Sequence, residues 1–122
     1  MTPRFCILLH DHPFRHWDLL IEKHDHAQCW RLLRQPVCGV PIPAEPLPPH
    51  RLLYLDYEGP VSNNRGVVVR IAEGTYQVVS GFPDFMIRLE GLAWAQFASL
   101  DNTSHDGVFW RFSSSLDQLG GH

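Results

Sequence analysis

The chain has 122 residues, of which 44% are hydrophobic and 19% charged, and its formal net charge is −3 with the histidines neutral. This length fits one domain, and the composition is that of a globular protein rather than a disordered chain. The acidic balance excludes a protein that wraps long stretches of duplex, because such proteins show a basic surface, so any contact with nucleic acid should be short and local.

Short apolar or alternating stretches, separated by Gly, Pro, Asn and Asp, run through the chain without a helical period. In chain order the predicted strands are 5–10, 16–22, 28–34, 51–57, 67–71, 75–80, 85–89, 92–97 and 108–112. Turn signals between them recur at the ~8–12-residue spacing that is typical of sandwiches and barrels. We therefore predict an all-β fold, a small closed or partly open β-barrel in which residues 1–122 form a single domain.

Two segments fall outside this pattern of strands. Residues 35–49 carry six prolines, so we predict a stiff, extended surface loop there rather than a helix or a central strand. Residues 113–122 are expected to form a loose tail, in which Leu116 and Leu119 could dock as one helical turn.

The N-terminal segment and the cysteines indicate a cytoplasmic protein without a membrane partner. The first ten residues hold one basic residue and a very short apolar run, which is not the pattern of a signal peptide. No apolar run approaches the ~18 residues that a spanning helix needs. Cys6, Cys29 and Cys38 are odd in number and lack C-x-x-C spacing, so we expect thiols rather than disulfides or a cysteine zinc site.

Histidines are densest around the predicted hairpin between the first two strands. Pro13 suits the loop of that hairpin, which would place His10 opposite His16 with their Cβ atoms ~5 Å apart. Asp18 shares a face of the second strand with His16, while the opposite face is apolar and should be core: Trp17, Leu19 and Ile21. Two imidazoles and a carboxylate can converge on a divalent cation such as Mn, Fe(II) or Zn, which acts as a Lewis acid.

A second polar stretch begins at His50. If it continues as a strand, His50 and Tyr54 share a face, where an imidazole and a phenol make a donor pair for a phosphate oxygen. The alternative is that Tyr54 is half-buried core and that His50 merely follows the proline-rich segment.

Together the two stretches resemble the 3′-phosphoesterase domain of the bacterial end-joining DNA ligase D and of its free-standing homologues. That family shows a histidine, five residues and then H-x-D-x-R-x-E, followed later by H-x-x-x-Y-x-D-[FY]-E-G. This chain has the corresponding residues His10, His16, Asp18, Leu20 and Glu22, and later His50, Tyr54, Asp56, Tyr57, Glu58 and Gly59. Weaker parallels are Cys29-Trp30 with the basic Arg34, and Gly74-Thr75-Tyr76.

The resemblance implies a compact β-barrel with its site in a cleft. It implies that His10, His16 and Asp18 bind a divalent metal, which is manganese by family, while two imidazoles also suit zinc or another transition metal. His50 would contact the phosphate with Tyr54 beside it, and Glu22 would support the ligands or orient a water.

The resemblance also implies an activity: removal of a 3′-phosphate or a 3′-terminal ribonucleotide from nucleic-acid ends in DNA repair. The expected partners are a DNA primer-template or a DNA/RNA junction, together with end-joining repair proteins. Whether histidine attacks the phosphate directly or assists water stays open.

One residue departs from the family pattern. Leu20 stands where the family has an arginine that would clamp phosphate, and leucine donates no hydrogen bond. Arg34 and Arg65 are the preferred substitutes, with Arg15 and Arg51 as further candidates; a solvated surface arginine is the alternative for each. Without a substitute, activity should be weak or lost.

Two other functions compete with the esterase. The domain could keep its metal and bind a nucleic-acid end or a protein without hydrolysis, as the loss of the arginine suggests. It could also be a mononuclear iron oxygenase, in which His16, Asp18 and His105 form a facial triad with Arg111 after it, although His10 would then be idle.

Overall fold

The computed structural model describes residues 2–81 and 85–115. Its elements, in chain order, are β1 (Arg4–His10), β2 (His16–Glu22), β3 (Ala27–Leu32), β4 (Pro41–His50), the 3₁₀-helix η1 (Leu52–Leu55), β5 (Gly59–Pro60), β6 (Val67–Ser80), β7 (Met86–Glu90), β8 (Phe97–Ser104) and β9 (Gly107–Ser113). No helix in the described part of the chain is long and apolar enough to cross a membrane.

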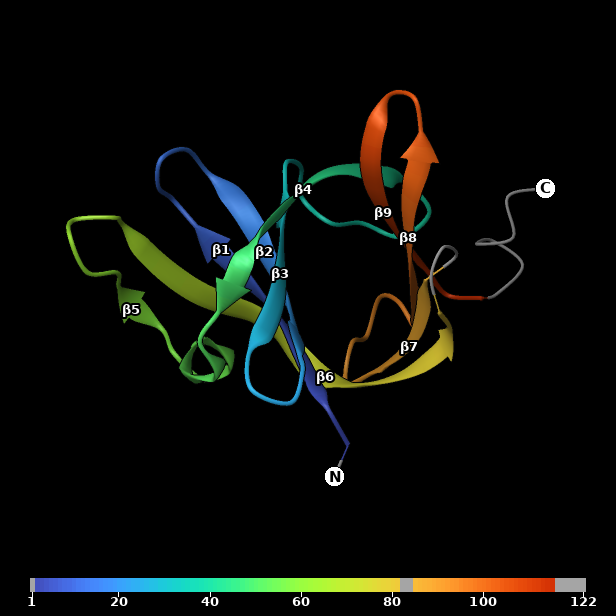
Figure 1. Cartoon of the computed structure of the whole chain (residues 1–122), viewed down its shortest axis with the longest axis horizontal. Helices are drawn as coiled ribbons and strands as arrows, with labels where there is room; N and C mark the ends of the chain where they lie inside the picture. Colours follow the sequence, from blue (N-terminus) through green and yellow to red (C-terminus); the bar gives the residue numbers. More distant parts are fainter. Residues whose placement is uncertain (1, 82–84, 116–122) are drawn as a thin grey trace.

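Eight of these strands close into an antiparallel barrel because β1 pairs with β2 on one side and with β6 on the other. The order around the barrel is β1-β2-β3-β4-β9-β8-β7-β6, and β5 lies outside it, paired with the start of β6 (Figure 1). Closure removes the two free edges that an open sheet of these strands would have. The prediction of a small closed all-β barrel is therefore confirmed.

Two separate apolar layers cover the two faces of the wall. The larger layer receives side chains from all eight barrel strands and so fills the interior, where Trp110 packs edge-on against Trp30 with ring centroids 5.1 Å apart. Trp17, Leu19 and Ile21 belong to this layer, as the alternation in the sequence predicted. The smaller layer covers the outer face of β1, β2 and β3, with Leu55 of η1 packed onto it.

The proline-rich segment is a barrel strand, so the prediction of a surface loop over residues 35–49 was wrong for its second half. β4 holds five prolines in ten residues and lies between β3 and β9. It pairs with β9 only over Pro41–Ala44 and with β3 only over Ala44–His50. Each stretch is thus open on one side, and a proline without an N–H is tolerated where a strand has an open side.

Four other predictions of local structure need correction. The predicted strand 51–57 is replaced by η1, and the predicted strand 92–97 lies mostly ahead of β8, which begins at Phe97. The predicted strands 67–71 and 75–80 are one long strand, β6, because the chain continues through Glu73-Gly74 without a turn. Ser113, predicted in the tail, ends β9, and the predicted docking of Leu116 and Leu119 lies outside the described residues.

Candidate metal centre

The β1–β2 hairpin brings together the three predicted metal ligands on the outer face of the barrel. His10 pairs directly with His16 in the strand register, and their ring centroids are 4.9 Å apart. Asp18 follows two residues later on β2, on the same face as His16. One ligand atom from each of the three side chains lies within 4.8 Å of the other two. These three residues, here called the metal group, could hold a metal ion.

Backbone carbonyls select the tautomer of each histidine. The His16 Nδ1–H donates to the carbonyl of Phe14 at 2.8 Å, and the His10 Nε2–H donates to the carbonyl of Arg65 at 2.8 Å. A carbonyl only accepts, so in the neutral rings the remaining nitrogens carry lone pairs: Nε2 of His16 and Nδ1 of His10. Metal-bound histidines are commonly oriented by such a hydrogen bond from the second ring nitrogen.

Both lone-pair nitrogens lie beside the Asp18 carboxylate. His16 Nε2 is 3.1 Å from Oδ1 of Asp18, and His10 Nδ1 is 3.4 Å from Oδ2. The His16 side chain is fully buried, and neither His16 Nε2 nor Asp18 Oδ1 has a hydrogen-bond partner among the described residues. Two imidazole lone pairs and a carboxylate that face one another repel unless a positive charge, a proton or a metal cation, lies between them, so this donor set can hold a divalent metal.

The connection between β5 and β6 holds the carbonyl that orients His10. Its turn contains Asn63 and Asn64 at positive φ and closes through a hydrogen bond from the Val61 N–H to the carbonyl of Gly66. The Asp11 carboxylate, in the β1–β2 loop, accepts a hydrogen bond from the Val67 N–H at 2.8 Å. The two loops, which lie at the left of Figure 1, therefore brace each other.

Gly66 allows this close approach. Its φ is +81°, and a Cβ there would collide with the Asp11 carboxylate and lie 2.7 Å from the His12 Cβ. A side chain at this position would therefore move the loop that carries the Arg65 carbonyl.

A cavity of about 230 Å³ opens beside the metal group. His10 and Asp18 line this cavity together with residues from the end of β4 and from η1 and its N-cap: Pro49, His50, Arg51 and Tyr54. His50 and Tyr54 contact each other edge-on with ring centroids 5.8 Å apart, although they do not share a strand. The His50 Nδ1–H donates to the Pro48 carbonyl at 3.1 Å, so Nε2 is the nitrogen that remains for a ligand.

The arginines proposed to replace the family arginine lie in different places. Leu20, at the family position, is fully buried in the outer apolar layer. Arg51 and Arg65 line the cavity, but the Arg65 guanidinium is held by the carbonyl and hydroxyl of Ser62 in its own loop. Arg15 and Arg34 are exposed and do not line this cavity.

The remaining acidic residues of the two motifs brace the fold. Glu22 lies at the far end of β2 from His16, where its carboxylate accepts a hydrogen bond from the Arg4 N–H at 2.7 Å, so it does not support the ligands as predicted. Asp56 pairs with the Arg4 guanidinium at 2.8 Å, and Glu58 pairs with Arg70 at 3.6 Å.

Sequence reasoning missed one cation near the metal group. Arg31 lies directly opposite Asp18 on β3, and its guanidinium lies over the Phe14 ring at 5.3 Å from the centroid. Its Nε is buried and has no hydrogen-bond partner among the described residues. The sequence feature that could have indicated Arg31 is the short turn between β2 and β3, because this turn sets the register in which Arg31 pairs with Asp18.

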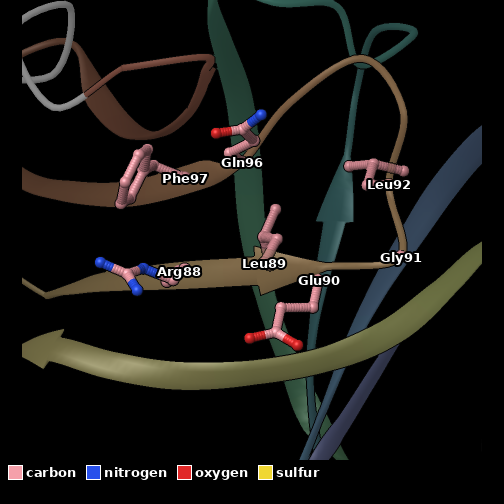
Figure 2. Close-up of a pocket in the computed structure, with 7 residues that line it drawn as sticks. All are labelled: Arg88, Leu89, Glu90, Gly91, Leu92, Gln96 and Phe97. Atoms are coloured by element: carbon pink, nitrogen blue, oxygen red, sulfur yellow. The ribbon is translucent and has the colours of Figure 1, made fainter.

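Other histidines and the larger cavity lie apart from this group. His105 is exposed in the β8–β9 hairpin, so the described residues bring His10, rather than His105, to His16 and Asp18. A cavity of about 500 Å³ lies along β7 and the start of β8 (Figure 2). Its charged side chains are Arg88 and Glu90, and it contains no cysteine or histidine.

Comparison with known proteins adds no family to this description. No protein-family model matches the chain, and no curated protein matches its sequence.

Proposed function

We propose that this chain is a metal-dependent 3′-phosphoesterase that removes a 3′-phosphate, or a 3′-terminal ribonucleotide, from nucleic-acid ends during DNA repair. The observation that carries the proposal is the group of His10, His16 and Asp18, of which His16 and Asp18 are buried and in which both imidazoles turn a lone-pair nitrogen toward the carboxylate. His10 and Asp18 of the group line a cavity that His50 and Arg51 also line, and both of these side chains can bind phosphate oxygens.

A divalent cation, with manganese the first candidate and zinc the second, would supply charge neutralisation on the phosphate oxygens. In hydrolysis a water oxygen bonds to phosphorus while the bond from phosphorus to the 3′ oxygen breaks, so the leaving oxygen must gain a proton. His50 suits the role of the base that takes a proton from the attacking water, because its Nδ1–H is held by the Pro48 carbonyl and the lone pair of Nε2 remains for the substrate side. The leaving 3′ oxygen can take its proton from bulk water at the open cavity. Arg51 supplies a permanent positive charge at the same cavity.

Leu20 favours a second candidate, a module that binds 3′-phosphorylated ends without hydrolysing them. The family arginine is replaced here by a fully buried leucine within an apolar layer, so no guanidinium reaches the substrate from this position. The metal group and the cavity would serve binding as well as catalysis.

A primer-template with a 3′-phosphate separates the two candidates. We expect the purified protein with Mn²⁺ to produce a 3′-hydroxyl, scored by extension with a polymerase, and expect chelation to stop it. His50→Gln should lower the rate ~100-fold or more, as the loss of an acid–base group does. His105→Gln, a change at an exposed histidine outside the group, is the matched control and should keep full activity. Metal-dependent binding of the primer without any 3′-hydroxyl product would reject the esterase and favour the binding module.

A further inference from the structure

One arginine without a carboxylate partner in the described part of the chain, Arg31, lies beside the hairpin loop that leads into His16. Among the described residues, the arginines with ion pairs are Arg4 and Arg70. Arg15 and Arg31 have no ion pair in the described part of the chain and lie over aromatic rings instead. An unpaired cation on a protein with a net negative charge is available to an anionic ligand.

Phe14 is the aromatic ring that Arg31 lies over. Its side chain is 48% exposed, its ring contacts His16 edge-on at 5.5 Å, and Arg31 lies 5.3 Å from its centroid. Arg15, the next residue, lies over Trp17 at 5.7 Å from that centroid. An exposed ring with an unpaired guanidinium group against it is an arrangement that binds bases by stacking and backbone phosphates by charge.

The backbone of Phe14 connects its exposed ring to the metal group. The Phe14 carbonyl accepts the hydrogen bond from His16 Nδ1–H, so the ring and a metal ligand are held two residues apart in one hairpin loop. A strand whose terminal phosphate reached His10 and Asp18 would bring its adjacent nucleotide within reach of this ring.

We propose that Phe14, with Arg31 over its ring, is a stacking platform for the nucleotide adjacent to the 3′-terminal phosphate of a nucleic-acid strand. The platform rests on the proposed function, since it assumes that the terminal phosphate lies at the metal group. It assigns the substrate as an oligonucleotide end rather than a free phosphate ester, with an unpaired or frayed terminal base.

Binding of a short single-stranded DNA with a non-hydrolysable 3′-phosphonate end tests the platform. We expect Phe14→Ala and Arg31→Gln each to raise the dissociation constant, measured by fluorescence anisotropy with Mn²⁺, about tenfold. Phe14→Ala keeps the carbonyl that orients His16, so its affinity for Mn²⁺ alone should equal that of the wild type in calorimetric titration. The matched control is Arg88→Gln, which removes another arginine that lies over a ring, that of Phe97 at 5.7 Å, at the cavity of Figure 2.

The outcomes distinguish the platform from the proposed function. A dissociation constant for Phe14→Ala within twofold of the wild-type value would overturn the platform. The platform would also be overturned if Arg88→Gln weakened DNA binding as much as Phe14→Ala does. Phe14-dependent binding without any phosphate release from a natural 3′-phosphorylated end would reject the esterase and leave the platform standing. Equal rates of phosphate release by wild type and Phe14→Ala at subsaturating DNA would reject the platform and leave the esterase.

Discussion

The variant Asp18→Asn removes the negative charge of the buried carboxylate but keeps nearly the same side-chain shape. The Asp18 oxygens lie 3.1 Å from His16 Nε2 and 3.4 Å from His10 Nδ1, and both nitrogens are acceptors when the rings are neutral. Asparagine has nearly the same volume, and its amide N–H can donate to one of these nitrogens. We therefore expect the metal-free variant to be at least as stable as the metal-free wild type, yet unable to bind a divalent cation tightly.

The expected magnitudes follow from linkage between binding and folding. Saturation of the wild type at about 100 times the dissociation constant adds ~2.7 kcal/mol to the free energy of unfolding. For a domain of this size each kcal/mol raises the melting temperature by ~3–5 °C, so Mn²⁺ should raise it by ~8–13 °C. One hydrogen bond gained by the metal-free variant should add ~1 kcal/mol.

Scanning calorimetry with EDTA and then with excess Mn²⁺ measures both effects. Asp25→Asn is the matched control, because Asp25 also contacts a histidine, His26 at 2.7 Å, but on the surface. This control should keep the full response to Mn²⁺. A wild-type shift below ~1 °C, or an equal shift in Asp18→Asn, would refute the assignment of the three side chains as a metal centre.

Three further expectations concern the loop, the core and the pH dependence. Gly66→Ala should lower Mn²⁺ affinity ~10–100-fold in calorimetric titration, because its Cβ would collide with the β1–β2 loop and displace the Arg65 carbonyl that orients the metal group. Gly39→Ala, at a similar φ of +84° but with open space around its Cβ, should leave that affinity unchanged. Trp110→Ala should cost ~3–5 kcal/mol in urea unfolding because the ring is fully buried inside the barrel, and a loss under ~1 kcal/mol would contradict this packing. Burial raises the pKa of the Cys6 thiol from 9.0 to about 12, so over that range only the unfolded state loses the proton and stability should fall as pH rises. Cys6→Ala should flatten this alkaline decline in urea titrations, and an unchanged slope would show that the thiol does not cause it.

The all-β fold class and the three side chains that could hold a metal ion were both predictable from the sequence alone. Alternation along β2 assigned Trp17, Leu19 and Ile21 to the core, and the structure confirms this assignment. The short loop at Pro13 set the register in which His10 faces His16. These features are local: strand alternation and hairpin register depend on residues within a few positions of one another, so a single sequence contains them.

The way in which distant segments complete the site could not be predicted from the sequence, because it depends on tertiary contacts. β4 accepts its prolines because its two neighbours pair with different halves of it, which the segment's own composition does not indicate. The predicted strand after His50 is a 3₁₀-helix whose Leu55 covers the outer face of the barrel, and this fold-back, rather than strand alternation, brings His50 and Tyr54 to the cavity. The Arg65 carbonyl that orients His10 is likewise 55 residues away in sequence. Such contacts between distant segments depend on how the barrel closes, because closure determines which outer faces of the strands a later segment can pack against.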